Sequence, residues 1–186
     1  LINFTYIRPE AIAEYATLSE GDKNAVDRLH ADTEPLNGDS QLIDRDAMWR
    51  SKMHALWIIF KAGRTAERQS VFDQFKADCG SDLEAYATWC LCYDKWGAPN
   101  GEESNWERKF NRNSPEIANL RKQYPDTLDF YRWLEWIAAE QLSSAQQAAK
   151  DAGMHIGIMS DMAVGVHPSG ADVWWNPERF AKGATV

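Results

Sequence analysis

The sequence contains few cysteines, and none of them is placed to form a metal site. Only three occur among 186 residues, Cys79, Cys90 and Cys92. The Cys-X-Cys pair lies in an aromatic run, and no second pair or nearby histidine completes a set of zinc ligands. We expect reduced, mostly buried thiols, which fit a cytoplasmic setting. We predict no metal or other cofactor.

Two further shortages exclude classes of partner. No uninterrupted apolar run approaches the ~18 residues of a membrane span, and no signal sequence begins the chain. Lys and Arg number 20 against 28 Asp and Glu, which gives a formal net charge of −8. Nucleic-acid binding needs a concentrated basic surface. Neither a membrane nor a nucleic acid is therefore an expected partner.

The motifs that mark several enzyme classes are also missing. There is no glycine-rich phosphate loop, no His-Glu-x-x-His helix and no Gly-x-Ser-x-Gly elbow. Glu102, Glu103 and Glu140 supply carboxylates, but single acidic residues in an acidic protein do not identify a paired acid and nucleophile. The motifs alone therefore do not identify the reaction that the protein catalyses.

Helical periodicity, by contrast, covers most of the chain. With 44% apolar residues, the sequence is long enough for one core, and we expect a single domain. A β-favouring stretch at 1–8, which ends before Pro9, predicts an early strand. Helical patterns then occupy roughly 9–18, 21–31, 44–62, 65–78, 81–96 and 114–123, with glycine or proline at the breaks.

The clearest element is a helix from about Leu128 to Ala152. Its apolar residues recur at spacings of three and four and form one stripe, and Gly153 ends it. The run 154–159 that follows is short and mostly apolar, with the length of a buried strand. The sequence therefore predicts a helix that leads into a buried strand, as in an α/β fold.

The loop after this strand is the expected binding region, because ligands of α/β folds bind at the carboxyl ends of strands. Asp161 stands at the strand end, and a turn-rich loop at 163–171 follows, with His167 in it and Asp172 just after it. The two carboxylates either position substrate hydroxyls or hold the loop through its N–H groups. His167 either donates to a sugar hydroxyl or is an exposed loop residue.

Nine tryptophans are an enrichment that needs an interpretation, since an indole ring suits stacking beneath a sugar. Trp174 and Trp175 follow the loop and are the sugar-contact candidates, although packing explains them equally well. Those inside helical patterns are interpreted as packing residues: Trp49, Trp57, Trp89, Trp133 and Trp136.

The run 153–180 resembles the strand-and-loop signature of amylomaltases, glycoside hydrolase family 77, through its strand-end Asp161, an Ala-Asp-Val-Trp segment and an Asn-Pro-Glu-Arg-Phe segment. Tyr6-Ile-Arg-Pro-Glu10 and Ile43-Asp44 with Lys52 resemble upstream family segments. Arg45, where many members carry Tyr, and Ser160, before the strand-end Asp, depart from the pattern. The resemblance covers nearly the whole chain and looks closest to the actinobacterial branch.

This resemblance implies a (β/α)₈ barrel enzyme that transfers 1,4-α-glucan segments between maltodextrin acceptors by a retaining mechanism. It implies a binding or site-organising role for Asp161 alone. His167, Asp172 and Trp174 are predicted as further substrate contacts from their places in and after the loop. The family's nucleophile and acid/base lie in later strands, and neither an Arg-Ile-Asp-His nor a Glu-Asp-Leu-Gly segment occurs here. We therefore predict no catalytic residue in this chain.

The chain is thus expected to be an excised, inactive and mainly helical piece with about two short strands. Its expected parts are an early strand (1–8), a helical insertion (9–123), and a barrel helix with the signature strand, loop and next helix (124–186). α-1,4-glucan oligosaccharides and the rest of the enzyme are the expected partners, with self-association of the isolated piece. The alternative is a free-standing helical interaction or carbohydrate-binding module.

Overall fold

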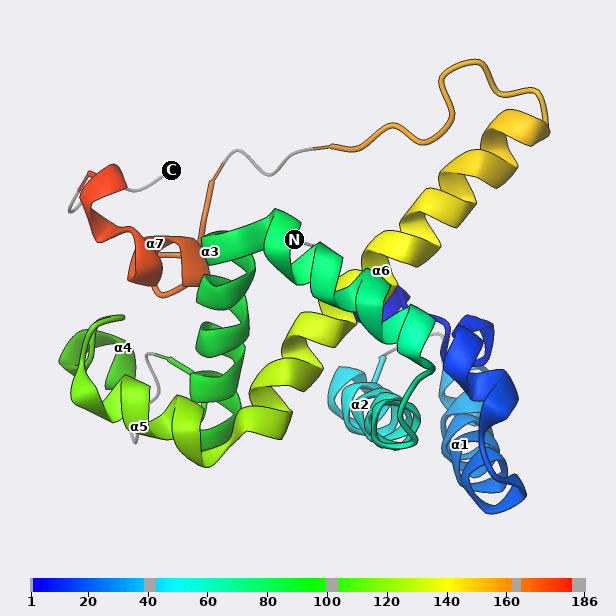
Figure 1. Ribbon diagram of the computed structural model, residues 1–186, viewed down its shortest axis with the longest axis horizontal. Coiled ribbons are helices and arrows are strands. Elements are labelled where there is room, and N and C mark those ends of the chain that lie inside the picture. Colours follow the sequence, from blue (N-terminus) through cyan, green and yellow to red (C-terminus); the bar gives the residue numbers. More distant parts are fainter. Residues whose placement is uncertain (1, 39–42, 100–103, 162–164, 182–186) are drawn as a thin grey trace. The chain divides into compact units, whose positions relative to one another are not determined.

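The computed structural model describes residues 2–38, 43–99, 104–161 and 165–181, and the secondary structure within them is entirely helical (Figure 1). The chain divides into two compact units, one of residues 1–73 and 133–145 and the other of residues 74–132 and 146–186. In chain order the elements are η1 (Phe4–Tyr6), η2 (Pro9–Ala11), η3 (Ala13–Thr17), α1 (Glu20–Thr33), η4 (Glu34–Gly38), α2 (Arg45–Lys61), α3 (Ala66–Trp96), α4 (Trp106–Lys109), α5 (Pro115–Gln123), α6 (Pro125–Asp151), α7 (Ala171–Trp175) and η5 (Pro177–Arg179).

The strand expected at 1–8 is not formed, and the 3₁₀ helix η1 takes its place in the described part of that range, 2–8. Asn3 caps this turn, because its Oδ1 accepts hydrogen bonds from the Thr5 N–H (3.0 Å) and the Thr5 hydroxyl (2.9 Å). Such a side-chain cap offers the backbone a local alternative to strand pairing. Pro9 then begins η2, as a residue suited to a first helical position.

The second expected strand, at 154–159, is irregular chain with a bend at residues 155 and 156, and it has no strand partner among the described residues (Figure 1). Gly157 has φ +79°, outside the β region. The Gln146 side-chain amide hydrogen-bonds the neighbouring backbone, donating to the Ile156 carbonyl (3.2 Å) and accepting from the Ile158 N–H (2.6 Å). A parallel strand needs neighbouring strands for its ladder, so the apolar pattern alone does not produce one here.

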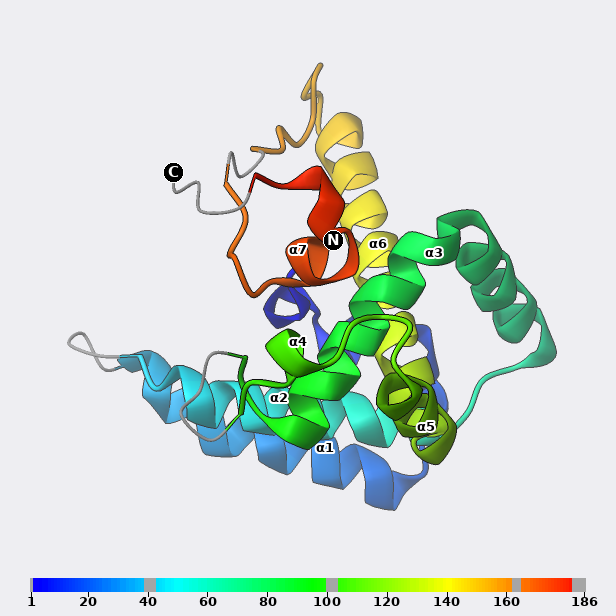
Figure 2. The ribbon, with the colours of Figure 1, turned by 90° about the vertical axis from the view of Figure 1, so that its left-hand side faces the viewer.

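In the first unit, α1 and α2 lie side by side (Figure 2). Ser19 and Asp44 cap them, each through a side-chain oxygen that accepts a backbone N–H in the first turn. Lys52 on α2 donates to the Thr5 carbonyl (2.6 Å) and so connects the helix to η1. Desolvation lowers the pKa of Lys52 below its ordinary value, although Glu10 partly opposes this.

The long helices α3 and α6 pass from one unit into the other. α3 bends at Gly80, whose φ of 53° and ψ of −131° are not helical, and this bend confirms the expected break between the patterns 65–78 and 81–96. α6 confirms the helix expected from about residue 128 to 152. Its stripe is buried as far as Ala138, whereas Leu142 is 40% exposed.

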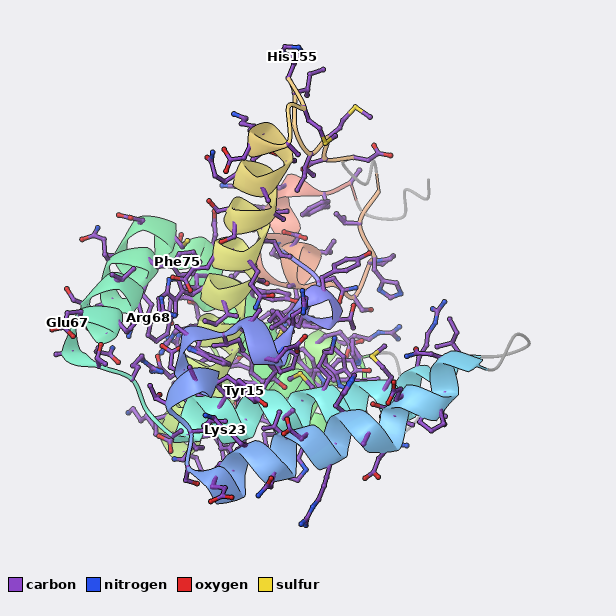
Figure 3. The ribbon with its side chains drawn as sticks, turned by 90° about the vertical axis from the view of Figure 1, so that its right-hand side faces the viewer. Tyr15, Lys23, Glu67, Arg68, Phe75 and His155 are labelled. Carbon is purple, nitrogen blue, oxygen red and sulfur yellow. The ribbon has the colours of Figure 1, made fainter. Side chains whose placement is uncertain are left out.

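A partly buried cluster of charges around Arg68 joins three segments of the first unit. Figure 3 labels Arg68 on its helix. Arg68 on α3 pairs with Glu14 of η3 (2.8 Å) and with Glu140 of α6 (2.5 Å), and its guanidinium lies 4.1 Å from the centre of the Trp136 ring. The Glu14 side chain is only 4% exposed. Arg68 therefore neutralises a carboxylate that is largely removed from water.

Glu135 on α6 is a second buried carboxylate of this unit, and it gives a pH-dependent prediction. One of its oxygens accepts the Ile2 N–H (3.2 Å). Desolvation raises its pKa above the ordinary 4.5, so the stability it contributes is full below that value and is lost as pH rises through the folded-state pKa. We expect Glu135→Gln to gain stability relative to the wild type as pH rises from about 4 to about 7. Denaturant unfolding at several pH values measures this, and a constant difference would contradict it.

Candidate functional site

A tight turn shapes the loop that carries His167. The Gly170 N–H donates to the His167 carbonyl (2.8 Å), and a Cβ at Gly170 would lie 3.0 Å from that oxygen, which favours glycine there. The Ser169 N–H donates to Nδ1 of His167 (3.1 Å). Since Nδ1 accepts, a neutral His167 ring carries its proton on Nε2, as a donor on an exposed side chain.

Four hydrogen bonds within the second unit fix this loop and the short helix α7. Trp89 Nε1 donates to the Ser169 carbonyl (3.1 Å), and Trp174 Nε1 donates to the Phe110 carbonyl (2.8 Å). Arg112 donates to the Trp175 carbonyl (2.6 Å) and also to the Asn176 side chain (3.1 Å). The loop is therefore attached to α3 and to the segment around α4.

Indole rings that pack edge-on or tilted against one another support these hydrogen bonds. Trp106, which is 3% exposed, lies at the centre of the group. Its ring is 5.5 Å from that of Trp174 at 81°, 6.4 Å from Trp89 and 6.2 Å from Trp96. Edge-to-face contacts of this kind add stability beyond burial alone. They also hold the Trp174 ring in place.

A groove of about 400 Å³ lies between the α4 segment and the loop. Phe110, Val173 and Trp174 contribute apolar surface to it. Glu107 and Lys109 bring charged groups, and the Glu107 side chain is only 6% exposed. The groove thus combines apolar walls with a few polar groups, as small-molecule sites commonly do.

The structure brings one of the four expected substrate contacts to this groove. Trp174 lines it, but the ring is 6% exposed and its N–H is already bonded to Phe110. Asp161, His167 and Asp172 are exposed and do not line the groove. Residues 162–164, part of the expected loop, lie outside the described residues.

Among the helical tryptophans, Trp133 and Trp136 are 0% and 2% exposed, which confirms their packing role. Trp57 and Trp89 are partly buried and contact neighbouring rings. The packing prediction is wrong for Trp49, which is 39% exposed and precedes the first buried residue of α2.

The groove residues on and after α4, above all Glu107 and Lys109, are not predicted from the sequence. This helix has four residues, too few for a periodic pattern, and it lies between the predicted helices 81–96 and 114–123. A tryptophan followed by one acidic and two basic residues is the one local signal.

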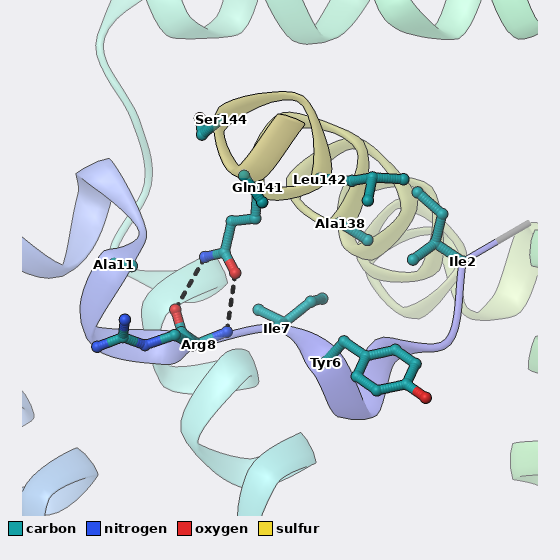
Figure 4. A pocket seen from close by; sticks show the side chains of 10 residues that line it. Ile2, Tyr6, Ile7, Arg8, Ala11, Ala138, Gln141, Leu142 and Ser144 are labelled. Carbon is teal, nitrogen blue, oxygen red and sulfur yellow. Dashed lines mark hydrogen bonds between the residues drawn. The ribbon is translucent and has the colours of Figure 1, made fainter. Parts of the chain in front are cut away.

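The first unit holds a larger cavity of about 580 Å³, between the η1 and η2 segment and α6 (Figure 4). The Gln141 side chain crosses its edge, accepting from the Arg8 N–H (2.9 Å) and donating to the Arg8 carbonyl (2.9 Å). Tyr6, which is 79% exposed, stands at its rim. None of the expected site residues lines this cavity.

Neither a membrane-spanning helix nor a metal-binding cluster occurs among the described residues. No helix there is both long and apolar enough to cross a membrane. No three or more His, Cys, Asp or Glu side chains in the same residues are grouped so that they could hold a metal ion.

Comparison with known proteins supports the expected resemblance. The family model for 4-alpha-glucanotransferase, glycoside hydrolase family 77, matches residues 1–186. A 4-alpha-glucanotransferase of Mycobacterium tuberculosis is 36% identical over the whole chain, and one of Haemophilus influenzae is 25% identical over 80% of it.

The crystal structure of amylomaltase from Corynebacterium glutamicum matches 92% of the chain with a TM-score of 0.73 and 35% identity. The chain spans 25% of the mycobacterial relative and 22% of the corynebacterial chain. The match of the family model to all 186 residues establishes that this chain belongs to the 4-alpha-glucanotransferase family, glycoside hydrolase family 77.

Proposed function

We propose that this chain acts as one segment of a longer 4-α-glucanotransferase that transfers 1,4-α-glucan segments between maltodextrin acceptors. The observation that best supports this proposal is the family match over all 186 residues. The chain also spans only about a quarter of the length of its relatives. A free-standing binding module is less favoured, since the matching proteins are named as enzymes over much longer chains.

In a retaining mechanism one carboxylate attacks the anomeric carbon and a second carboxylic acid protonates the leaving oxygen. A 4-hydroxyl group of another glucan then replaces water in the second step. We assign both reacting carboxylates to parts of the enzyme outside this chain. The chain alone is accordingly inactive, and its contribution is to bind and position the glucan.

Within that role, Asp161 and Asp172 accept hydrogen bonds from glucan hydroxyls, and His167 donates one through Nε2. The exposure of all three side chains is compatible with this role. Trp174 acts mainly through position, since its burial and its bond to Phe110 leave little ring surface for stacking.

The architectural proposal is that residues 124–186 supply a helix, a strand with its loop and the next helix of a (β/α)₈ barrel, and that 9–123 form a helical insertion. Segment 154–159 becomes a strand when neighbouring strands are present. The enzyme is cytoplasmic. When expressed alone, the chain self-associates through exposed apolar residues such as Leu142, Ile156 and Met159.

The test is maltotriose conversion by a family-length protein that contains this chain. We expect glucose and maltopentaose in equal amounts, and a loss of about 10- to 100-fold in kcat/KM for Asp161→Asn, the usual range for a hydrogen bond to a charged group. Asp32→Asn, an exposed carboxylate of α1, is the control. Full activity of Asp161→Asn would remove this residue from the site, and absence of conversion by the unaltered protein would refute the proposed function.

A further inference from the structure

We propose that the groove between the α4 segment and the His167 loop is itself a glucan-binding subsite, formed by Glu107, Lys109 and Asn111 against an apolar wall. This inference rests on the proposed function for the identity of the ligand. Glu107, Lys109 and Asn111 belong to a segment for which the sequence predicts no role in binding.

The apolar wall fits the C–H faces of a glucose ring. Pro168 and Pro177 are exposed at the groove, and Val173 and Phe110 are half-buried in it. Rings of this kind pack on flat apolar surfaces while their hydroxyls point to the edges. The volume of about 400 Å³ lies within the usual range for small-molecule sites.

The polar groups supply both kinds of hydrogen-bonding partner that a sugar hydroxyl needs. The Glu107 carboxylate accepts, and the exposed Lys109 ammonium donates. Asn111 Oδ1 already accepts the Asn113 N–H (2.9 Å), and the amide nitrogen of this groove-lining side chain is a donor. A polyhydroxylated ligand uses all three groups at once.

The charges of the groove favour a neutral ligand over a phosphorylated one. The Glu107 side chain is only 6% exposed, and its carboxylate is 3.6 Å from the guanidinium of Arg108, which also lines the groove. A phosphate group close to this largely buried carboxylate would meet repulsion that the exposed Arg108 and Lys109 side chains, screened by solvent, offset only weakly. An uncharged glucan avoids that cost.

The walls of the groove are already fixed without a ligand. Trp174 on the loop side donates to the Phe110 carbonyl on the opposite side (2.8 Å) and packs edge-on against Trp106. The Ser169 carbonyl is held by Trp89. Because binding then orders few additional groups, little affinity is lost to conformational entropy.

Isothermal titration of the 186-residue chain with maltoheptaose tests this subsite. We expect Lys109→Ala to weaken binding about tenfold, through loss of a hydrogen bond from a charged donor, and Val173→Phe, which fills the groove, to weaken it at least as much. Lys122→Ala on α5 makes the same charge change outside the groove and should bind as the wild type does.

Circular dichroism of each variant identifies any loss of folding. Lys109→Ala is the variant least expected to unfold, because the Lys109 side chain is exposed. Wild-type affinity in both groove variants, or no binding of maltoheptaose by the unaltered chain, would overturn the subsite. Equal affinity for cellohexaose would overturn its assignment to α-glucans. Since no turnover is measured, these outcomes are separate from the maltotriose result, on which the proposed function depends.

Discussion

Replacing Arg68 with alanine is expected to lower the free energy of unfolding of the first unit by about 3–5 kcal/mol, the usual cost of removing one partner of a buried ion pair. The change leaves the Glu14 carboxylate, 4% exposed, without its cation. It also removes the guanidinium from the face of Trp136 and from Glu140. Urea unfolding followed by circular dichroism measures the loss.

Arg8→Ala is the matched control for this experiment. Its ion pair with Glu10 joins side chains that are 72% and 53% exposed. Exposed pairs of this kind contribute about 0–1 kcal/mol. A loss for Arg68→Ala no larger than that for Arg8→Ala would show that the Arg68 cluster does not stabilise the unit.

Trp133→Ala is expected to cost about 3–5 kcal/mol, as large-to-small substitutions of buried aromatic residues do. Trp133 on α6 is fully buried, and its ring centre lies 5.6 Å from that of Phe60 on α2. The substitution leaves a cavity between the helices that their backbones cannot close. Thermal unfolding and urea unfolding should both report it.

Trp49→Ala removes the same side chain from a position that is 39% exposed, and we expect a cost below about 1 kcal/mol. The comparison separates burial from residue type. Equal losses in the two variants would contradict the core described for the first unit.

Helix α6 shows which features could be predicted from the sequence. Its apolar stripe has helical spacing, Pro125 suits its first turn, and Gly153 follows its end with φ +90°, so local chemistry determines both boundaries. The break at Gly80 was predictable for the same reason, because glycine adopts the required backbone angles at little cost.

The strand expected at 154–159 depends on partners that its own residues do not specify. An apolar run indicates burial, but only a neighbouring strand can complete a parallel ladder, and Gln146 instead bonds to this backbone. The groove could not be predicted either. Glu107 and Val173 are far apart in the sequence, and the Trp174 bond to Phe110 that brings their segments together leaves no periodic signal.

The most direct test of the central claim compares maltotriose conversion by the isolated 186-residue chain and by a family-length protein that contains it. If the chain positions glucan for carboxylates located elsewhere, the isolated chain yields no product. The longer protein then yields glucose and longer maltooligosaccharides with no net gain of reducing ends. Turnover by the repurified isolated chain would contradict this account, and so would net hydrolysis as the main activity of the longer protein.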